Sequence, residues 1–171
     1  MDPRVELAAR NNAHLCDAVC RAHGQATNLT DQVWTCLGTP PRFYSCLTTL
    51  APGVAEVVFN VDPGGFKDGF NDIDATSHGY ALLFDAFWIW HPVGPQPEKR
   101  FTWRKVTTER ELLEWEQGWA AADLDASRYP RQFPNSLLNN SELAFVAGHN
   151  QGELVAGCIL NLTPPVVGPP G

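Results

Sequence analysis

The residues best suited to acid–base chemistry are a carboxylate and an imidazole within one strongly apolar stretch, Tyr80–His91, which reads YALLFDAFWIWH. Asp85 lies inside it. A buried carboxylate is costly without a partner, so one placed there indicates a site. The alternatives are an ion pair with an arginine such as Arg104, or a position facing solvent. In a strand, the side chain of His91 would lie on the same face as that of Asp85, so His91 is a second catalytic candidate.

A third catalytic candidate, Glu142, begins a predicted hairpin and could act as a base. Trp88, Trp90 and Trp103 are candidate substrate-binding residues, because ligand pockets are lined by aromatic side chains with few polar groups. The alternative is that Glu142 lies on the surface and that the tryptophans belong to the core.

Two patterns bring possible metal ligands together, and neither is complete. Cys16, Cys20 and His23 lie at helical spacing, but no second pair follows to finish a zinc site, so the cysteines are expected on a buried helix face. The acidic stretch DPGGFKDGFNDID, residues 62–74, departs from the calcium-loop pattern and is expected to be a solvated turn. We therefore expect no metal.

The elements of the first half follow from periodicity and from turn residues. The range Pro3–Ala22 is expected to be a helix, capped by Asp2 and ended by Gly24. Strands are expected at Val33–Leu37 and Phe43–Leu50, residues 54–60 fit a strand or a short helix, and Tyr80–His91 is expected to be a central strand.

The second half predicts a strand, a helix and a hairpin. The strand is Phe101–Val106, and the helix begins at Thr107 or Thr108 and runs to about Ala122. Thr108 and Glu111 have the spacing of a capping box. The expected apolar face of the helix comprises Leu112, Leu113, Trp115, Trp119 and Ala120. The hairpin strands are residues 143–149 and 152–162, with a turn at Asn150-Gln151-Gly152.

These elements predict an α+β fold with a mixed, mainly antiparallel sheet flanked by helices. The Pro-rich stretch Val93–Lys99 divides residues 1–95 from residues 100–171. We expect the two halves to share one sheet and one core.

Composition restricts the partners. The chain has 171 residues, a net charge of −7 and five cysteines. The negative charge argues against nucleic acid or an anionic membrane as partner. The sequence has neither a signal-peptide core nor an apolar run long enough to cross a membrane, and the odd number of cysteines favours reduced thiols in the cytoplasm.

Residues of about 100–168 resemble the first half of a GNAT-type N-acetyltransferase, in an uncharacterised bacterial branch. The resemblance rests on FTWRKV, on the helix ERELLEWEQGWAAA and on the hairpin LAFVAGHNQGELVAGCILNLT. That family runs strand, helix, helix, two hairpin strands and a fourth strand. The resemblance implies acetyl transfer from acetyl-CoA to an amine, with acetyl-CoA as the cofactor.

In the family, the fourth strand leads into a Q/R-x-x-G-x-G/A loop whose N–H groups hold the pyrophosphate of the cofactor. Here Val166-Val167-Gly168 is followed by Pro169-Pro170-Gly171, so we expect no autonomous binding of acetyl-CoA. The stretch RAHGQA, residues 21–26, matches the loop pattern but follows a helix, so Gly24 is read as a helix end.

Two non-enzymatic alternatives stay open. One is a module that binds a small ligand, and the other is a protein-binding module. In the second case a partner chain or a second copy in a homodimer would complete the sheet, because an uncapped hairpin edge favours strand addition.

Overall fold

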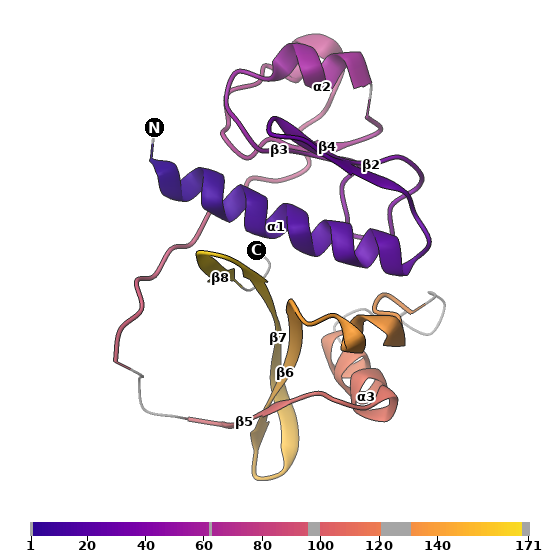
Figure 1. Ribbon diagram of the computed structural model, residues 1–171, viewed down its shortest axis with the longest axis vertical. Coiled ribbons are helices and arrows are strands. Elements are labelled where there is room, and N and C mark those ends of the chain that lie inside the picture. The colour runs from indigo at the N-terminus through magenta and orange to yellow at the C-terminus, as the bar shows by residue number, and fades with distance from the viewer. Residues whose placement is uncertain (1, 62, 96–99, 121–130, 169–171) are drawn as a thin grey trace. The chain divides into compact units, whose positions relative to one another are not determined.

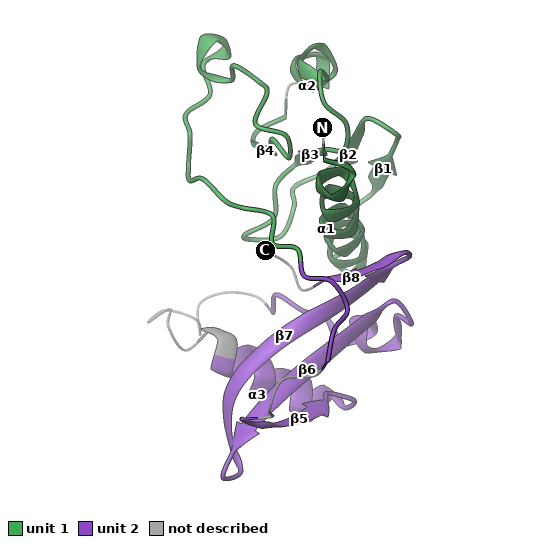
Figure 2. Ribbon diagram, turned by 90° about the vertical axis from the view of Figure 1, so that its left-hand side faces the viewer, with its two compact units in different colours: residues 1–90, 171 green, residues 91–170 purple. Residues whose placement is uncertain are grey.

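The computed structural model describes residues 2–61, 63–95, 100–120 and 131–168, with the side chains of residues 119 and 120 excepted. The chain divides into two compact units, residues 1–90 and 91–170 (Figure 2). Helices and mostly antiparallel strands occur together, which confirms the α+β class. None of the described helices is long and apolar enough to cross a membrane.

Unit 1 begins with helix α1, Pro3–Ala22, as predicted. The Asp2 side chain caps the helix by accepting a hydrogen bond from the Arg4 backbone N–H (3.0 Å). Pro3 is tolerated in the first turn, because a backbone N–H at that position would have no partner within the helix. At the other end Gly24 takes a positive φ of 76°, and its N–H donates to the Arg21 carbonyl (2.9 Å). The reading of RAHGQA as a helix end is confirmed.

A four-stranded mixed sheet lies between the α-helices α1 and α2 (Ala55–Val61) of unit 1 (Figure 1). Its strands are β1 (Thr27–Leu29), β2 (Val33–Cys36), β3 (Leu47–Thr49) and β4 (Phe66–Lys67), in that order. Trp34 and Cys36 pack with α1 on one face. Val33 and Leu47 pack on the other face with Val58 of helix α2. The ambiguous segment 54–60 is thus a helix.

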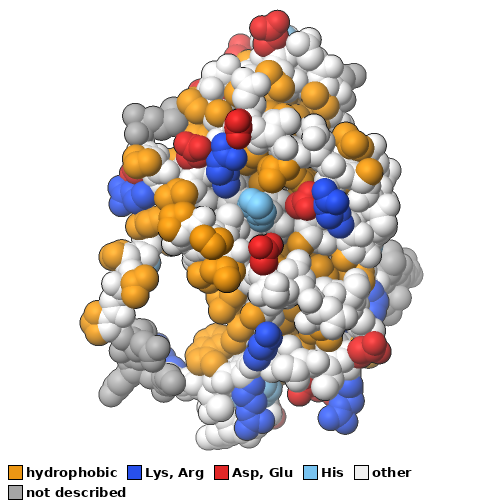
Figure 3. Space-filling model, in the orientation of Figure 1, with side chains coloured by type: hydrophobic (Ala, Val, Ile, Leu, Met, Phe, Trp, Pro, Cys, Tyr) orange, Lys and Arg blue, Asp and Glu red, His pale blue; other side chains and the backbone are white. Residues whose placement is uncertain are grey.

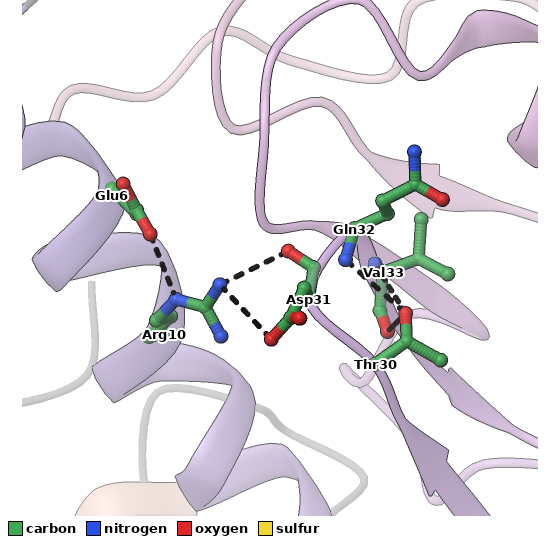
Figure 4. A network of polar contacts seen from close by, with 6 residues as sticks. All are labelled: Glu6, Arg10, Thr30, Asp31, Gln32 and Val33. Carbon is green, nitrogen blue, oxygen red and sulfur yellow. Dashed lines mark hydrogen bonds and ion pairs between the residues drawn. The ribbon is translucent and has the colours of Figure 1, made fainter.

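An arginine links α1 to the turn between β1 and β2 (Figure 4). The Arg10 guanidinium lies 3.1 Å from a Glu6 carboxylate oxygen and donates to the Asp31 carbonyl (3.0 Å). The Thr30 hydroxyl accepts from the Val33 N–H (3.0 Å) and donates to the Val33 carbonyl (2.9 Å), which closes the turn. These contacts align the first hairpin with α1.

Two strand predictions in unit 1 need correction. The strand expected at Phe43–Leu50 covers only Leu47–Thr49, because Phe43 takes a φ of 71° and the Tyr44 N–H closes a turn onto the Pro41 carbonyl. The predicted central strand Tyr80–His91 is wrong: these residues form neither helix nor strand and are mostly exposed. Their aromatic and aliphatic composition favours a strand, but a strand also needs a neighbour, and no described strand pairs with them.

Unit 2 contains a separate antiparallel sheet of four strands in the order β5-β6-β7-β8 (Figure 1). The strands are β5 (Thr102–Lys105), β6 (Leu143–Asn150), β7 (Glu153–Thr163) and β8 (Val166–Gly168), with the short helix η3 (Asn135–Asn139) before β6. The predicted hairpin is confirmed. Gln151 and Gly152 form its two-residue turn, both with positive φ (51° and 92°), as the twist of a tight hairpin requires.

Helix α3, Glu109–Ala120, covers one face of this sheet. The capping box is confirmed: the Thr108 N–H donates to the Glu111 carboxylate (3.0 Å), and the Glu111 N–H donates to the Thr108 hydroxyl (3.3 Å). Trp115 packs edge-on against Phe145, and its indole N–H donates to the Val146 carbonyl (3.0 Å). The helix and the hairpin therefore share one aromatic core.

The predicted apolar face of α3 is right in part. Leu112 and Trp115 are buried, whereas Leu113 is 40% exposed. The side chains of Trp119 and Ala120 lie outside the described residues. Glu116, from the same helix, accepts hydrogen bonds from the Arg131 side chain and the Phe133 N–H, which places Phe133 beside Trp115.

The two sheets have no strand in common, since β1 to β4 pair only with one another and so do β5 to β8. We expected both halves to contribute strands to one sheet, whereas the described strands of each unit form a sheet of their own. The boundary between the units, at residues 90 and 91, lies just before the Pro-rich stretch Val93–Lys99, of which residues 96–99 are outside the described part.

Candidate functional site

A depression in unit 2 is the candidate ligand site. Its volume is about 370 Å³, within the size of ordinary small-molecule pockets. It lies where the start of β5 meets the tip of the β6–β7 hairpin, and it is lined by Arg100, Phe101, Thr102, Trp103, His149, Asn150 and Gln151.

Strand register brings these residues together. In the antiparallel pairing of β5 with β6, Thr102 lies opposite His149 and Trp103 lies opposite Gly148. A Cβ atom at Gly148 would be 3.0 Å from the Trp103 ring, so glycine leaves the room that the indole occupies. The rings of Phe101 and Trp103 meet edge to face, with centroids 6.2 Å apart. The result is an aromatic wall beside a polar turn.

The polar groups of the depression are a cation and an imidazole. Arg100 is exposed and supplies a guanidinium. The Nδ1 atom of His149 is buried and has no hydrogen-bond partner among the residues that the structure describes. A guanidinium next to the exposed ring of Trp103 and the half-buried ring of Phe101 is suited to a small anion that has a planar apolar part, because the guanidinium pairs with carboxylates while a ring stacks.

The structure places the three predicted catalytic residues on the surface. Asp85 is exposed and, within the described part of the chain, forms no ion pair. The burial on which its selection as a site residue rested is therefore absent, and of the alternatives the position facing solvent is the one that the structure shows. His91 is exposed, and its Nδ1 atom lies 2.6 Å from the Pro92 carbonyl oxygen. Glu142 is exposed and contributes its backbone carbonyl to the Leu162 N–H (2.8 Å). Asp85, His91 and Glu142 are therefore not among the residues that line the depression.

The three tryptophans have different surroundings. Trp103 lines the depression and is 46% exposed. Trp88 packs against the unit 1 core, and its indole N–H donates to the Gly69 carbonyl (2.8 Å). Trp90 is 41% exposed. Only Trp103 has the position expected of a substrate-binding residue.

The helix cysteines face the core, as predicted. Cys16 and Cys20 are buried against Ala13, Trp34 and Cys36. Burial raises the pKa of the Cys16 thiol to about 11, and it raises the pKa of Cys20 as well, so both remain protonated thiols at neutral pH. These two cysteines act as small apolar side chains.

The acidic loop is organised by one carboxylate. Asp68 accepts hydrogen bonds from four backbone N–H groups, those of Phe70, Asn71, Asp72 and Ile73, at 2.9 to 3.1 Å. Asp72 in turn accepts from the Gly53 N–H (2.8 Å). The described residues contain no group of three or more His, Cys, Asp or Glu side chains placed to hold a metal ion.

Sequence reasoning missed Arg100 and His149 as site residues. Arg100 precedes one predicted strand and His149 ends another, so the depression could be anticipated only by pairing residues 101–106 with residues 143–149. That pairing joins segments about 45 residues apart, and the local sequence carries no signal for it.

Comparisons with protein-family models, with curated proteins and with solved structures found no match to this chain.

Proposed function

We propose that the protein is related to the GNAT-type N-acetyltransferases, that its substrate is not yet identified, and that it does not bind acetyl-CoA by itself. The supporting observation is the order of elements in unit 2. A strand (β5) is followed by a helix (α3), by a hairpin (β6–β7) and by a fourth strand (β8) antiparallel to β7. The resemblance implies this order with a second helix before the hairpin, where the described residues contain only the short helix η3.

Strand β8 adds to what the sequence suggested. Asn161, Leu162 and Thr163 of β7 pair with Gly168, Val167 and Val166 of β8. A fourth strand therefore occupies the place next to β7 where the resemblance expects one. Cross-strand nuclear Overhauser contacts between residues 161–163 and 166–168 would test this pairing directly, and their absence would remove the support for the proposal.

Calorimetric titration with acetyl-CoA tests the proposal that the chain does not bind this cofactor by itself. We expect no binding at cofactor concentrations up to about 1 mM, because Pro169 and Pro170 have no N–H to donate to a pyrophosphate. Micromolar binding accompanied by acetylation of an amine would instead make the chain an autonomous enzyme. Coenzyme A without the acetyl group is the matched control, since it carries the same pyrophosphate.

A second candidate function is the binding of a small aromatic anion, and the depression beside Arg100 and Trp103 favours it. Benzoate is a suitable probe, with benzyl alcohol as the uncharged control. We expect benzoate to shift the indole resonance of Trp103 at lower concentration than benzyl alcohol does. Arg100→Gln should remove that difference, whereas Arg104→Gln, outside the depression, should keep it. Equal shifts from both probes would exclude the anion site.

A further inference from the structure

We propose that Ala81–Trp90, here called the apolar segment, is a dimerisation strand that pairs with the same segment of a second copy of the chain. The inference goes beyond the proposed function and does not depend on it. It rests on the exposure of the segment, on its unpaired backbone, on the way it is anchored and on the area that it offers.

The apolar segment exposes large hydrophobic side chains to an unusual degree. Leu82, Leu83, Phe84, Phe87 and Ile89 are between 70% and 91% exposed. Figure 3 shows hydrophobic side chains on the surface of the chain that leads into residues 96–99. Scattered apolar residues on a surface need no explanation, but a contiguous group of this size indicates an interaction site.

The backbone of the segment is also free. None of the N–H and C=O groups of residues 81–90 forms a hydrogen bond with a residue that the structure describes. Figure 2 shows this run of chain, between η1 (Thr76–His78) and unit 2, as a drawn-out trace. Its composition is that of a β-strand. A strand-forming segment with unpaired backbone groups is a template for pairing with another strand.

The segment is held at both ends, so less conformational freedom is lost on binding. At one end, the Tyr80 hydroxyl donates to the Pro63 carbonyl (2.7 Å), and the ring packs against Phe66. At the other end, Trp88 packs on the core and donates to the Gly69 carbonyl (2.8 Å).

The area on offer matches that of a stable interface. A fully exposed large apolar side chain contributes on the order of 150 to 200 Å², so the five named residues present on the order of 700 Å² per copy. A standard protein interface buries about 800 Å² on each partner. In a symmetric dimer the same patch of each copy forms the interface, so the molecule needs no second, complementary patch.

The chemistry of the segment favours a strand over a lipid surface. In the hydrocarbon core of a membrane the N–H and C=O groups of the segment would stay unpaired. The Asp85 carboxylate would also be buried there, which is costly for a charged group. A partner strand satisfies the backbone, and an antiparallel offset keeps the two Asp85 side chains from lying directly opposite each other. The net charge of −7 further disfavours anionic lipid.

Sedimentation equilibrium of the full chain, with amide hydrogen exchange on the same samples, tests the proposal. We expect a dimer with a Kd on the order of 1 to 10 μM and protected amides within residues 82–87. Leu83→Lys should weaken the dimer at least about tenfold, because it places a charge in the contact. Leu37→Lys is the matched control, since Leu37 is also exposed (66%) but lies outside the segment; it should leave the dimer unchanged. Leu83 is 88% exposed, so folding should survive its replacement, and circular dichroism would verify this.

Cross-linking identifies the segment of the partner. Under mild oxidation Ala86→Cys should form a covalent dimer, whereas the unaltered chain and Leu37→Cys should not. The proposal is overturned if the chain stays monomeric at about 100 μM, or if the amides of residues 82–87 are protected in a monomer. It is overturned equally if Leu83→Lys and Leu37→Lys behave alike, or if the chain binds phosphatidylcholine vesicles and does not dimerise.

Discussion

At the scale of single residues, Asp17 contributes more to unit 1 than any of the predicted catalytic residues. Its carboxylate accepts hydrogen bonds from the Thr27 hydroxyl (2.5 Å), the Trp34 indole (3.1 Å) and the Arg21 guanidinium (2.7 Å). It thereby joins α1 to β1 and β2. Burial alone would raise the pKa of Asp17, but the three hydrogen bonds outweigh burial and lower the pKa below its usual value.

Asp17→Asn should therefore destabilise the protein by about 1 kcal/mol at pH 7, because the charge-assisted bond with Arg21 is lost. A lowered pKa in the folded state stabilises the protein above the unfolded pKa, which is about 4 for Asp, and that contribution disappears as the pH falls through the folded pKa. Urea unfolding at pH 7 and pH 3 should show the difference between Asp17→Asn and the unaltered chain shrinking at low pH.

Asp31→Asn is the control for this prediction, because the Asp31 side chain is fully exposed. It should change the free energy of unfolding by less than about 0.5 kcal/mol at either pH. A difference for Asp17→Asn that is the same at both pH values would mean that the carboxylate does not contribute through its charge.

At the scale of elements, the contact of α3 with the second sheet depends on a position without a side chain. A Cβ atom at Gly157 in β7 would lie 2.4 Å from Nε1 of Trp115. Trp115 is buried and forms the aromatic cluster with Phe133 and Phe145. The glycine thus allows the helix and the hairpin to approach closely enough for the indole N–H to reach the Val146 carbonyl.

Gly157→Ala should displace the Trp115 ring, break its hydrogen bond and cost about 1 to 3 kcal/mol of stability. Tryptophan fluorescence during urea unfolding would measure the loss. Gly65→Ala is the comparison, because a Cβ there meets no atom within 4 Å and no positive φ is involved, so it should be close to neutral. Equal stability of the two variants would contradict this account of the packing.

The elements also show what sequence reasoning could recover. Helix α1, both of its ends, the capping box of α3 and the Gln151-Gly152 hairpin were all predicted, because each depends on residues within one or two turns of chain. The conformation of Tyr80–His91 was predicted wrongly, because a β-strand forms only where another strand pairs with it. For the same reason Asp85, inferred as a site from its presumed burial, is exposed.

At the scale of the whole molecule, the chain comprises two units with separate sheets, residues 1–90 and 91–170. The core clusters around Trp34 and Leu47 and the aromatic cluster around Trp115 each draw on residues of one unit. Local stability follows local contacts, so a change in one core is expected to act mainly on its own unit.

Hydrogen exchange of backbone amides tests this expectation. Asp17→Asn should raise exchange rates in Val33–Cys36 and leave those of Leu143–Asn150 unchanged, and Gly157→Ala should do the reverse. If either substitution raised exchange in both sheets to the same extent, the two units would unfold as one.

By itself, the sequence determined the α+β class, the limits of helix α1, the capping box of α3 and the hairpin turn. These features are encoded by caps, periodicity and turn residues that act over a few positions. The tertiary structure alone decided that Ala81–Trp90 has no partner strand within the described residues, that β8 pairs with β7, and that Arg100, Trp103 and His149 surround one depression. Each of these outcomes depends on which distant segments pair, and pairing is settled by the packing of the folded chain.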